Sequence, residues 1–534
     1  MRTSLAVLPV CVVAALSSCG QDAALKSSGA GTRVLAPVPA SSVVAAAQGA
    51  PAEAPAWLTA RVAVHFHSPI SHDACDGDGK PDGPLAGRDQ TCLAQLREAL
   101  CASKIDVGLL TDHPAHTSEL TFEEDLLYLA AAGDQLVIDA SGAPIANRIA
   151  CPGGGTALVA AGFEGTHSMP LGLHGKLDPA LYGVHALATT APADLAALNA
   201  GVKAAGGVLF MAHSEESDMP ASVLAPLEGA GMEWYNVHGN FKMLLGQDQV
   251  GAGLSLKDVP LLLKTLKGFE PFLAGSSSGA SADLVYLVLL SAAFPEPGLQ
   301  KWHDVLGHRF VPGALGNDVH RNISVAPLCK GALAKVACAA LAGGSPNALT
   351  LLATGGDVRL VDGERIDTFA RVLRWLNNRV LVKHKTVDEA VAALAAGRGY
   401  GVFAVLGEPG AFAYWADAPA GRIELGGEAP AAGTKLRVRL PDPPAPELGA
   451  QWTPADAAKA ELRAILWRTT AAGKTQVAEL KAFGATVEVD PPGPGAYSLE
   501  VLLTPHHLDA ALGSASALAS HEYRWLLTNA IVLK

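Results

Sequence analysis

The chain has 534 residues, of which 49% are hydrophobic and 17% are charged, and its 39 Lys and Arg against 51 Asp and Glu give a formal net charge of −12. The high apolar content excludes an intrinsically disordered protein. The acidic balance argues against a nucleic-acid partner, because phosphate backbones require clustered Lys and Arg. At about 150 residues per domain, this length predicts two to four domains.

The N-terminal segment is typical of an export signal. Arg2 precedes an apolar run that ends in Leu16-Ser17-Ser18-Cys19, which resembles the cleavage box of bacterial lipoproteins. That resemblance implies a signal peptide, residues 1–18, and a lipid anchor on Cys19 that would be the sole membrane contact. Residues 19–57 have the composition of a flexible tether. With such an anchor we expect the bacterial cell envelope, at the outer membrane or the periplasmic face, and the absence of Asp directly after Cys19 favours the outer membrane. A secretory signal with an incidental Cys19 is the alternative.

Short apolar runs that alternate with amphipathic runs predict parallel β-α-β units in residues 58–407. The expected strands cover residues 61–66, 105–110, 156–163, 208–212, 232–237 and 312–315. The expected helices cover residues 93–101, 192–205, 282–293, 299–307, 367–381 and 386–396. This number of units favours a barrel-like α/β domain.

After residue 408 the pattern changes to short strands divided by Pro, Gly and Asp clusters. The expected strands cover residues 422–425, 435–440, 461–468, 485–489 and 497–503. Such spacing predicts a C-terminal antiparallel β-sandwich domain, residues 408–534.

Six cysteines remain after the anchor position, namely Cys75, Cys92, Cys101, Cys151, Cys329 and Cys338. An even set in an exported protein favours disulfides, although the sequence leaves their connectivity open. Proximity favours Cys329 with Cys338, followed by Cys75 with Cys92.

Metal-ligand residue types stand where the predicted strands end. His65-Phe66-His67 closes the first strand, and alternation along a strand would place both imidazoles on one face. The later strand ends carry Asp112 and His113, Glu164, His213, Glu233 with Asn236 and His238, and Asp318 with His320. In α/β barrels the chemistry lies at the C-terminal strand ends. His506 and His507, in a late loop, are expected to be solvated.

The motif series H-F-H-S, T-D-H, G-F-E, A-H-S and G-N-D-V-H-R resembles the PHP (polymerase and histidinol phosphatase) family of metal-dependent phosphoesterases over residues 58–405. The resemblance implies a distorted seven-stranded βα (TIM-like) barrel with two or three metal ions at its mouth. It implies one metal held by His65, His67, Glu164 and Asp318, a second held by Glu164 and His213, and a third near His72, His113 and His320. It also implies that His238 takes a remaining ligand place and that Arg321 meets a phosphate oxygen. The sequence departs from the family pattern at Ser214 and Asn317.

The resemblance implies hydrolysis of a small phosphate ester by metal-activated hydroxide. Imidazole with carboxylate favours zinc, manganese or iron, and such ions yield hydroxide near neutral pH. Asp112 or His238 is the candidate for proton transfer to the leaving group. Substrate identity and oligomeric state are left open by the sequence.

Three other interpretations stay open. A degenerate metal centre would make the protein a non-catalytic, metal-binding surface lipoprotein. Gly275-Ser276-Ser277-Ser278-Gly279 fits the elbow of a serine hydrolase, with Ser277 as the nucleophile. Asp76, Asp78 and Asp82 resemble a calcium loop, which would hold a structural calcium ion, and a plain polar turn is the alternative.

Overall fold

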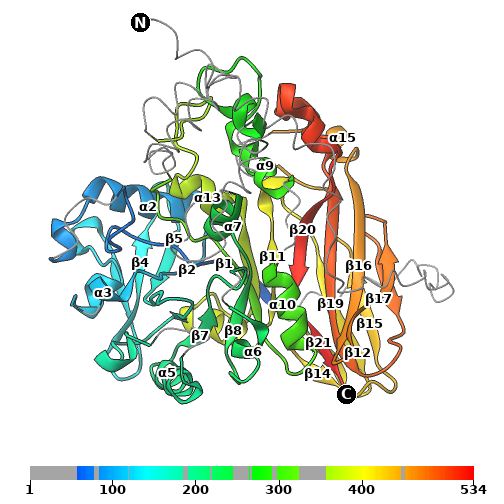
Figure 1. Ribbon diagram of the computed structural model, residues 1–534, viewed down its shortest axis with the longest axis horizontal. Coiled ribbons are helices and arrows are strands. Elements are labelled where there is room, and N and C mark those ends of the chain that lie inside the picture. The colour runs from blue at the N-terminus through cyan, green and yellow to red at the C-terminus, as the bar shows by residue number, and fades with distance from the viewer. Residues whose placement is uncertain are drawn as a thin grey trace, which may run out of the picture. The chain divides into compact units, whose positions relative to one another are not determined.

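The computed structural model describes residues 57–76, 83–117, 119–184, 190–216, 219–244, 264, 267–291, 297–323, 357–446 and 451–534. All of these residues belong to one compact unit, residues 44–534. The fold is mixed α/β with several sheets, including antiparallel sheets at the C-terminal end of the chain (Figure 1).

The first sheet has a parallel centre with antiparallel strands on both sides. The centre consists of β1 (Leu58–Val64), β2 (Val107–Leu109) and β5 (Thr156–Ala160). Beyond β5 lie β4 (Pro144–Ala150) and β3 (Gln135–Ile138), and beyond β1 lie β10 (Asn377–Val382) and β11 (Gly399–Val402). All six residues that pair in register between β1 and β2 are apolar or glycine, which suits strands covered on both faces.

A second sheet contains β6 (Met169–Leu171), β7 (Val208–Met211), β8 (Gly231–Asn236) and β9 (Gly313–Gly316). The last three strands run parallel, and every residue of the four strands is buried. Two isolated bridges connect this sheet to the first, Ala161 with Leu173 and Phe66 with Val319. Continuous ladders within the described residues do not close a barrel.

Helices cover these sheets and begin at recognisable caps. Asp89 caps α2 (Gln90–Ala102) by accepting from the Cys92 amide at 2.9 Å, and Thr386 caps α14 (Val387–Ala395). The other α-helices in the described part of the chain before residue 408 are α3 (Pro114–Thr117), α4 (Phe122–Asp125), α5 (Pro192–Ala204), α6 (Ala221–Leu224), α7 (Val237–Leu244), α9 (Tyr286–Ser291), α10 (Pro297–Leu306) and α13 (Phe369–Trp375). Among the described residues, none of the helices combines the length and apolar character needed to span a bilayer.

The six expected strands before residue 320 are confirmed, and one expected helix is wrong. Residues 367–381 divide into α13, which ends at Trp375, and strand β10. β10 pairs with β1 on one side and β11 on the other, and its residues Asn377, Val380 and Val382 are weak helix formers. Sheet pairing therefore decides the conformation of this segment.

The C-terminal strands form two antiparallel sets. One sheet has the order β13 (Gly421–Glu424), β12 (Ala413–Ala418), β15 (Lys435–Arg439) and β18 (Thr486–Val489). The other set contains β14 (Glu428–Ala429), β16 (Glu461–Thr470), β17 (Gly473–Leu480), β19 (Gly495–Thr504), β20 (Tyr523–Thr528) and β21 (Ile531–Leu533). α15 (Pro454–Ala457) and α16 (Asp509–Leu512) accompany them. Because β20 pairs with β11, this second set continues the first sheet (Figure 1).

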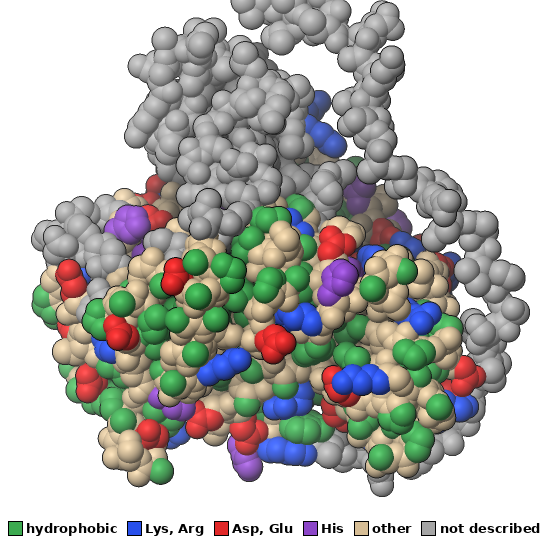
Figure 2. Space-filling view, turned by 60° about the horizontal axis from the view of Figure 1, so that its bottom comes forward, with side chains coloured by type: hydrophobic (Ala, Val, Ile, Leu, Met, Phe, Trp, Pro, Cys, Tyr) green, Lys and Arg blue, Asp and Glu red, His purple; other side chains and the backbone are tan. Residues whose placement is uncertain are grey.

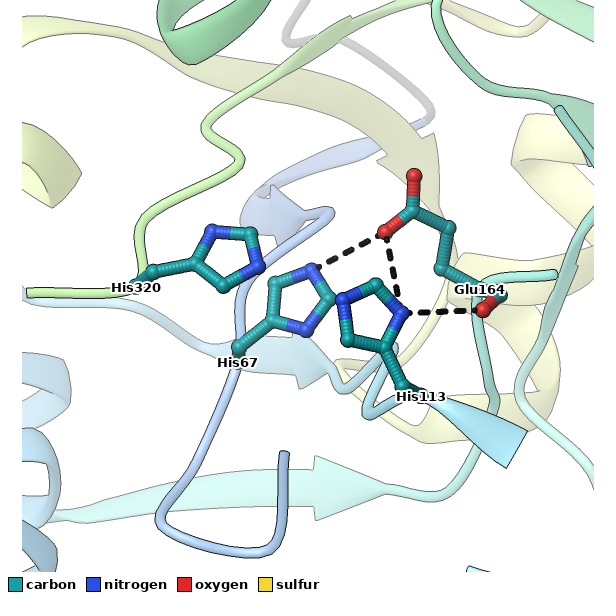
Figure 3. Close-up of side chains that lie close together, drawn as sticks. All are labelled: His67, His113, Glu164 and His320. Carbon is teal, nitrogen blue, oxygen red and sulfur yellow. Dashed lines mark hydrogen bonds and ion pairs between the residues drawn. The ribbon is translucent and has the colours of Figure 1, made fainter. Parts of the chain in front are cut away.

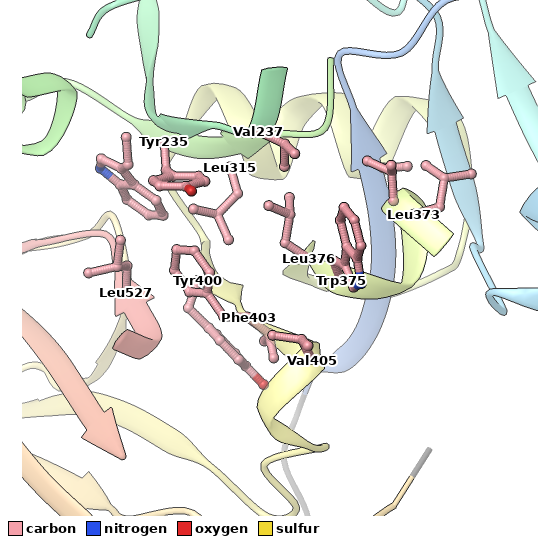
Figure 4. Close-up of a cluster of buried hydrophobic side chains, with 14 of the residues drawn as sticks. Tyr235, Val237, Leu315, Leu373, Trp375, Leu376, Tyr400, Phe403, Val405 and Leu527 are labelled. Carbon is pink, nitrogen blue, oxygen red and sulfur yellow. The ribbon is translucent and has the colours of Figure 1, made fainter. Parts of the chain in front are cut away.

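A buried apolar cluster lies where the two parts of the chain meet. Figure 4 shows Tyr235 of β8 and Leu315 of β9 facing Tyr400 of β11 and Leu527 of β20. Tyr235 and Phe403 lie edge to face, with ring centroids 5.3 Å apart. The C-terminal strands thus share one core with the strands that carry the site.

On the face drawn in Figure 2, the charges are mixed. Lys and Arg side chains alternate with Asp and Glu side chains over the described residues of this face. Interspersed charges of both signs are typical of a solvated surface.

Candidate metal centre

The centre lies at the C-terminal ends of five parallel strands. His65 follows β1, Glu164 comes four residues after β5, and His213 comes two residues after β7. His113 follows β2, and Asp318 and His320 follow β9. Three of these residues have left-handed backbone angles, with φ of 60° at His65, 50° at His213 and 46° at Asp318. Such angles are uncommon for residues other than glycine and collect at functional sites, where the surrounding structure holds them.

The first group of potential ligands is fully buried and consists of His65, Glu164, His213 and Asp318. His65 Nε2 lies 3.3 Å from Glu164 Oε2 and 3.3 Å from Asp318 Oδ1. His213 Nε2 lies 2.8 Å from Glu164 Oε1 and 3.5 Å from Asp318 Oδ2. Two imidazoles and two carboxylates therefore face a common point.

The second group, His67, His113, Glu164 and His320, is drawn in Figure 3. His67 Nε2 lies 3.3 Å from Glu164 Oε2, and His113 Nδ1 lies 3.7 Å from the same oxygen. The rings of His67 and His320 stack with centroids 3.7 Å apart. Glu164 belongs to both groups, so its carboxylate would be shared by them if each group held an ion. His67 Nε2 also lies 3.6 Å from Asp318 Oδ1, so both histidines of the first motif face the same two carboxylates.

Asp73 extends the cluster on the side of His113 and His320. Its carboxylate oxygens lie 3.3 Å from His113 Nε2 and 3.4 Å from His320 Nε2. The exposed His72 joins Asp73 and His113 in a further group of three. Sequence reasoning did not single out Asp73 as a ligand, although it follows His72 directly in the loop after the first motif.

Second nitrogens of these imidazoles are held by neighbouring groups. His65 Nδ1 donates to Glu233 Oε1 at 2.7 Å, and His67 Nδ1 donates to Ser71 Oγ at 2.8 Å. His213 Nδ1 lies 3.2 Å from Glu215 Oε1. Such outer contacts fix the ring orientation and are characteristic of metal-ligating histidines. Glu233, expected among the ligand types at the strand ends, instead contacts the outer nitrogen of His65. Glu215 and Ser71 were not recognised from the sequence, because their contacts depend on the turn geometry.

The atoms that face the cluster fit a metal ion. Among the described residues, the buried atoms His65 Nε2, His67 Nε2, His320 Nε2 and both Asp318 carboxylate oxygens make no hydrogen bond. Buried polar atoms are normally hydrogen-bonded or coordinate a metal. Imidazole nitrogens with carboxylate oxygens suit zinc, manganese or iron.

Electrostatics couple the two kinds of ligand. Burial alone would lower the pKa of His65, but Asp318, Glu233 and Glu164 together raise it well above its ordinary value. Burial alone would raise the pKa values of Glu164 and Asp318. The neighbouring His65 and His213 nevertheless hold both pKa values well below the ordinary range. Both carboxylates are therefore ionised at neutral pH and favour bound cations.

The residues expected to act on the substrate are spread around this cluster. Asp112 lies behind His67, because its carboxylate accepts from the Ser68 amide at 2.7 Å and from Ser71 Oγ at 2.9 Å. His238 Nδ1 lies 3.8 Å from Asp318 Oδ2, at the edge of the cluster. Arg321 has a φ of 56°, and its guanidinium lies 4.0 Å from Asp76.

The serine-hydrolase interpretation is wrong. Ser277 is exposed in a coil between two 3-10 turns, Glu270–Phe272 and Ala282–Val285, and no strand precedes it among the neighbouring described residues. A nucleophile elbow requires a strand, a sharp turn and a helix.

The structure describes one of the three residues of the predicted calcium loop, Asp76. Asp76 pairs with Arg365 at 2.9 Å, so its carboxylate already has a cationic partner. Asp78 and Asp82 lie outside the described residues, as do Cys19, Cys329 and Cys338.

Two disulfides are formed by the described cysteines. The predicted pair Cys75–Cys92 is confirmed, and Cys101 pairs with Cys151. Cys75 is two residues from Asp73, so the first disulfide fastens the loop that carries this acidic residue.

Comparisons with known proteins give one distant structural likeness. No family model matches the chain, and no curated protein sequence matches it. Among solved structures, a two-domain protein containing a predicted PHP-like metal-dependent phosphoesterase from Bacteroides vulgatus ATCC 8482 is 9% identical, with a TM-score of 0.24, over 89% of this chain and 96% of that chain. A TM-score of this size establishes neither a shared fold nor a shared activity.

Proposed function

We propose that this protein is a metal-dependent hydrolase of phosphate esters. The observation that carries the proposal is the convergence of five imidazoles and the Glu164 and Asp318 carboxylates at the strand ends, with buried atoms that make no hydrogen bonds. We infer for the fold that β1, β2, β5 and β6–β9 form a distorted seven-stranded barrel, which the two isolated bridges between the sheets support. The C-terminal strands would form a β-sandwich domain.

Each side chain has a definite part in this proposal. His65, His213, Glu164 and Asp318 would hold one ion, and His67, His113 and His320 would hold a second with the shared Glu164. Asp73 would complete a third position. When bound, such divalent ions supply a hydroxide nucleophile near neutral pH and neutralise phosphate oxygens. His238, at the edge of the cluster, is placed to exchange a proton with the leaving group, and Arg321 is the candidate to contact phosphate.

The location of the protein belongs to the same proposal. We infer export to the cell envelope with a lipid anchor on Cys19. The two disulfides support a compartment outside the reducing cytoplasm, where such bonds persist.

Metal content and turnover test the function together. Elemental analysis of the purified chain should find zinc, manganese or iron in more than equimolar amount, and the protein should hydrolyse a phosphate monoester or diester. The double change His65→Ala with His67→Ala should remove the metal and lower turnover by about a thousandfold, because ion binding supplies several kcal/mol of transition-state stabilisation.

The exposed His521 provides a matched control. His521→Ala should retain both metal and turnover. Full hydrolysis by metal-free protein would refute the proposal, whereas tight metal binding without hydrolysis of any ester in the panel would favour a non-catalytic metal-binding protein.

A further inference from the structure

A pocket beside the candidate metal centre has mostly apolar walls. Its space is about 370 Å³ when the open solvent at its mouth is counted, and Asp318, His320 and His238 of the candidate centre are among its lining residues. The other lining residues are Val237, Phe241, Leu289, Asn317, Val319, Asn322, Ile323, Ile366, Asp367, Val372 and Trp375. Figure 4 shows Val237 and Trp375 among the surrounding buried side chains.

The polar lining side chains outside the candidate centre are engaged within the protein. Asp367 accepts from Arg365 Nε at 2.9 Å and from the Ile323 amide at 2.5 Å. Asn322 donates to the Asp73 carbonyl at 2.7 Å. Trp375 donates its indole N–H to the Asp283 carbonyl at 2.7 Å, so its ring presents carbon to the pocket.

Asn317 and Arg365 also make hydrogen bonds or ion pairs within the protein. Asn317 donates to the carbonyls of Val372 and Leu376 at 3.2 and 3.1 Å, which leaves its Oδ1 as an acceptor. Arg365 lies behind Asp367 and also pairs with Asp76 and Asp357 at 2.9 and 2.7 Å. Lys and Arg are absent from the described residues that line the pocket. A second phosphate or a polyhydroxylated sugar would therefore find few partners there.

We infer that this pocket receives the apolar alcohol portion of the phosphate ester, so the preferred substrates are esters of alkyl or aryl alcohols. This inference rests on the proposed function, since the phosphate group would lie at the candidate metal centre. Apolar walls favour an apolar group by about 25 cal/mol for each Å² removed from water. Small-molecule sites generally combine such walls with a few polar groups that fix orientation.

Binding of two phosphonates to the metal-loaded full chain tests the inference without turnover. Cyclohexylmethylphosphonate should bind at least about tenfold more tightly than methylphosphonate in isothermal titration calorimetry, because its ring removes apolar surface from water. Equal affinities would overturn the pocket assignment and leave the proposed function in place. Failure of both compounds to bind would overturn the proposed function and the pocket assignment with it.

Hydrolysis of two esters with six-membered rings provides a second readout. Cyclohexylmethyl phosphate and glucose 6-phosphate are both esters of primary alcohols and differ mainly in ring polarity. We expect kcat/KM to favour the cyclohexylmethyl ester by at least about tenfold. Equal values, or preference for the sugar ester, would contradict the assignment.

Two variants locate the effect in the pocket. Val372→Thr and Ile366→Thr each place a hydroxyl in an apolar wall and should reduce the ratio of the two phosphonate affinities by about threefold to tenfold. Val202→Thr, in the buried face of α5, is the matched control and should keep the wild-type ratio. An unchanged ratio in both pocket variants would place the selectivity elsewhere and overturn the assignment.

Discussion

Single residues behind the ligands determine how the candidate metal centre is arranged. The Glu233 carboxylate is fully buried and accepts from His65 Nδ1 at 2.7 Å and from the His213 amide at 2.9 Å. It therefore orients two histidines at once. A Cβ atom on Gly316 would lie 1.7 Å from Glu233 Oε1, so glycine is required there for close approach. Glu233 is a positioning residue for the metal ligands.

Removing this support should weaken metal binding. We expect Glu233→Ala to reduce metal affinity by about tenfold to a hundredfold, the usual effect of losing an outer carboxylate. Gly316→Ala should have a similar effect because it displaces the same carboxylate. Titration calorimetry with Zn²⁺ measures both. Gly175→Ala, with no atom within 4 Å of the added Cβ, is the control. Wild-type affinity in Glu233→Ala would contradict the positioning role.

The expectation that His507 is solvated is wrong. Its burial leads to a second prediction at the scale of single residues. The ring is 3% exposed and donates from Nε2 to the Leu406 carbonyl at 3.0 Å. Burial lowers its pKa to about 4. Since the unfolded side chain has a pKa near about 6.5, the unfolded state binds the proton first as the pH falls.

The stability contributed by neutral His507 should therefore be present at pH 7 and lost as the pH falls from about 6.5 to about 4. We expect this group to account for about 2 kcal/mol of the loss in unfolding free energy between pH 7 and pH 5. Urea unfolding at the two pH values measures the effect. His507→Gln should show a smaller pH dependence, and His506→Gln should keep the wild-type dependence. Identical slopes in both variants would refute the assignment.

At the scale of elements, the loop after β1 carries both a disulfide cysteine and the candidate ligand Asp73. Cys75 is linked to Cys92 in the first turn of α2, and its amide donates to the His320 carbonyl at 2.8 Å. These contacts fix the loop that presents Asp73 to His113 and His320. The disulfide therefore supports both the fold and the placement of Asp73 beside His113 and His320.

Removing each disulfide in turn should show which of them affects metal binding as well as the free energy of unfolding. Cys75→Ser with Cys92→Ser should cost about 3 kcal/mol from loop closure, and it should also lower the number of tightly bound ions. Cys101→Ser with Cys151→Ser should cost about 4 kcal/mol and keep the metal content. Denaturant unfolding and elemental analysis measure the two effects. Equal metal content in the two variants would contradict the role of the first disulfide.

At the scale of the whole molecule, the C-terminal strands support the sheet that carries the centre. β20 pairs with the edge of β11, and Trp525 donates to the Gly407 carbonyl at 2.7 Å. Glu408 accepts from Arg61 of β1 at 2.9 Å and from Arg379 of β10 at 2.7 Å. The predicted boundary near residue 408 thus falls at a point with many contacts on both sides.

A chain that ends at residue 407 should not fold stably. It would expose the β11 edge and the apolar side chains around Phe403, which favours aggregation. Size-exclusion chromatography and circular dichroism of residues 57–407 and 57–534, expressed in the same compartment, test this expectation. A monomeric, cooperatively folding fragment 57–407 would contradict it.

The sequence by itself indicated the β-α-β order and the strand ends with ligand chemistry. His65, His113, Glu164, His213 and Asp318 could be recognised because parallel strands align their carboxyl ends at one edge. The structure brings these residues together at that edge. Local pattern was sufficient for this result, because each ligand type stands within a few residues of the end of an apolar run.

Only the tertiary structure decided the features that depend on distant partners. Residues 377–382 are a strand because β1 and β11 flank them, and His507 is buried because the Leu406 backbone meets it. The supporting role of Glu233 depends on the space that Gly316 leaves. Such contacts arise from packing between segments far apart in the chain, which neither periodicity nor a local motif records.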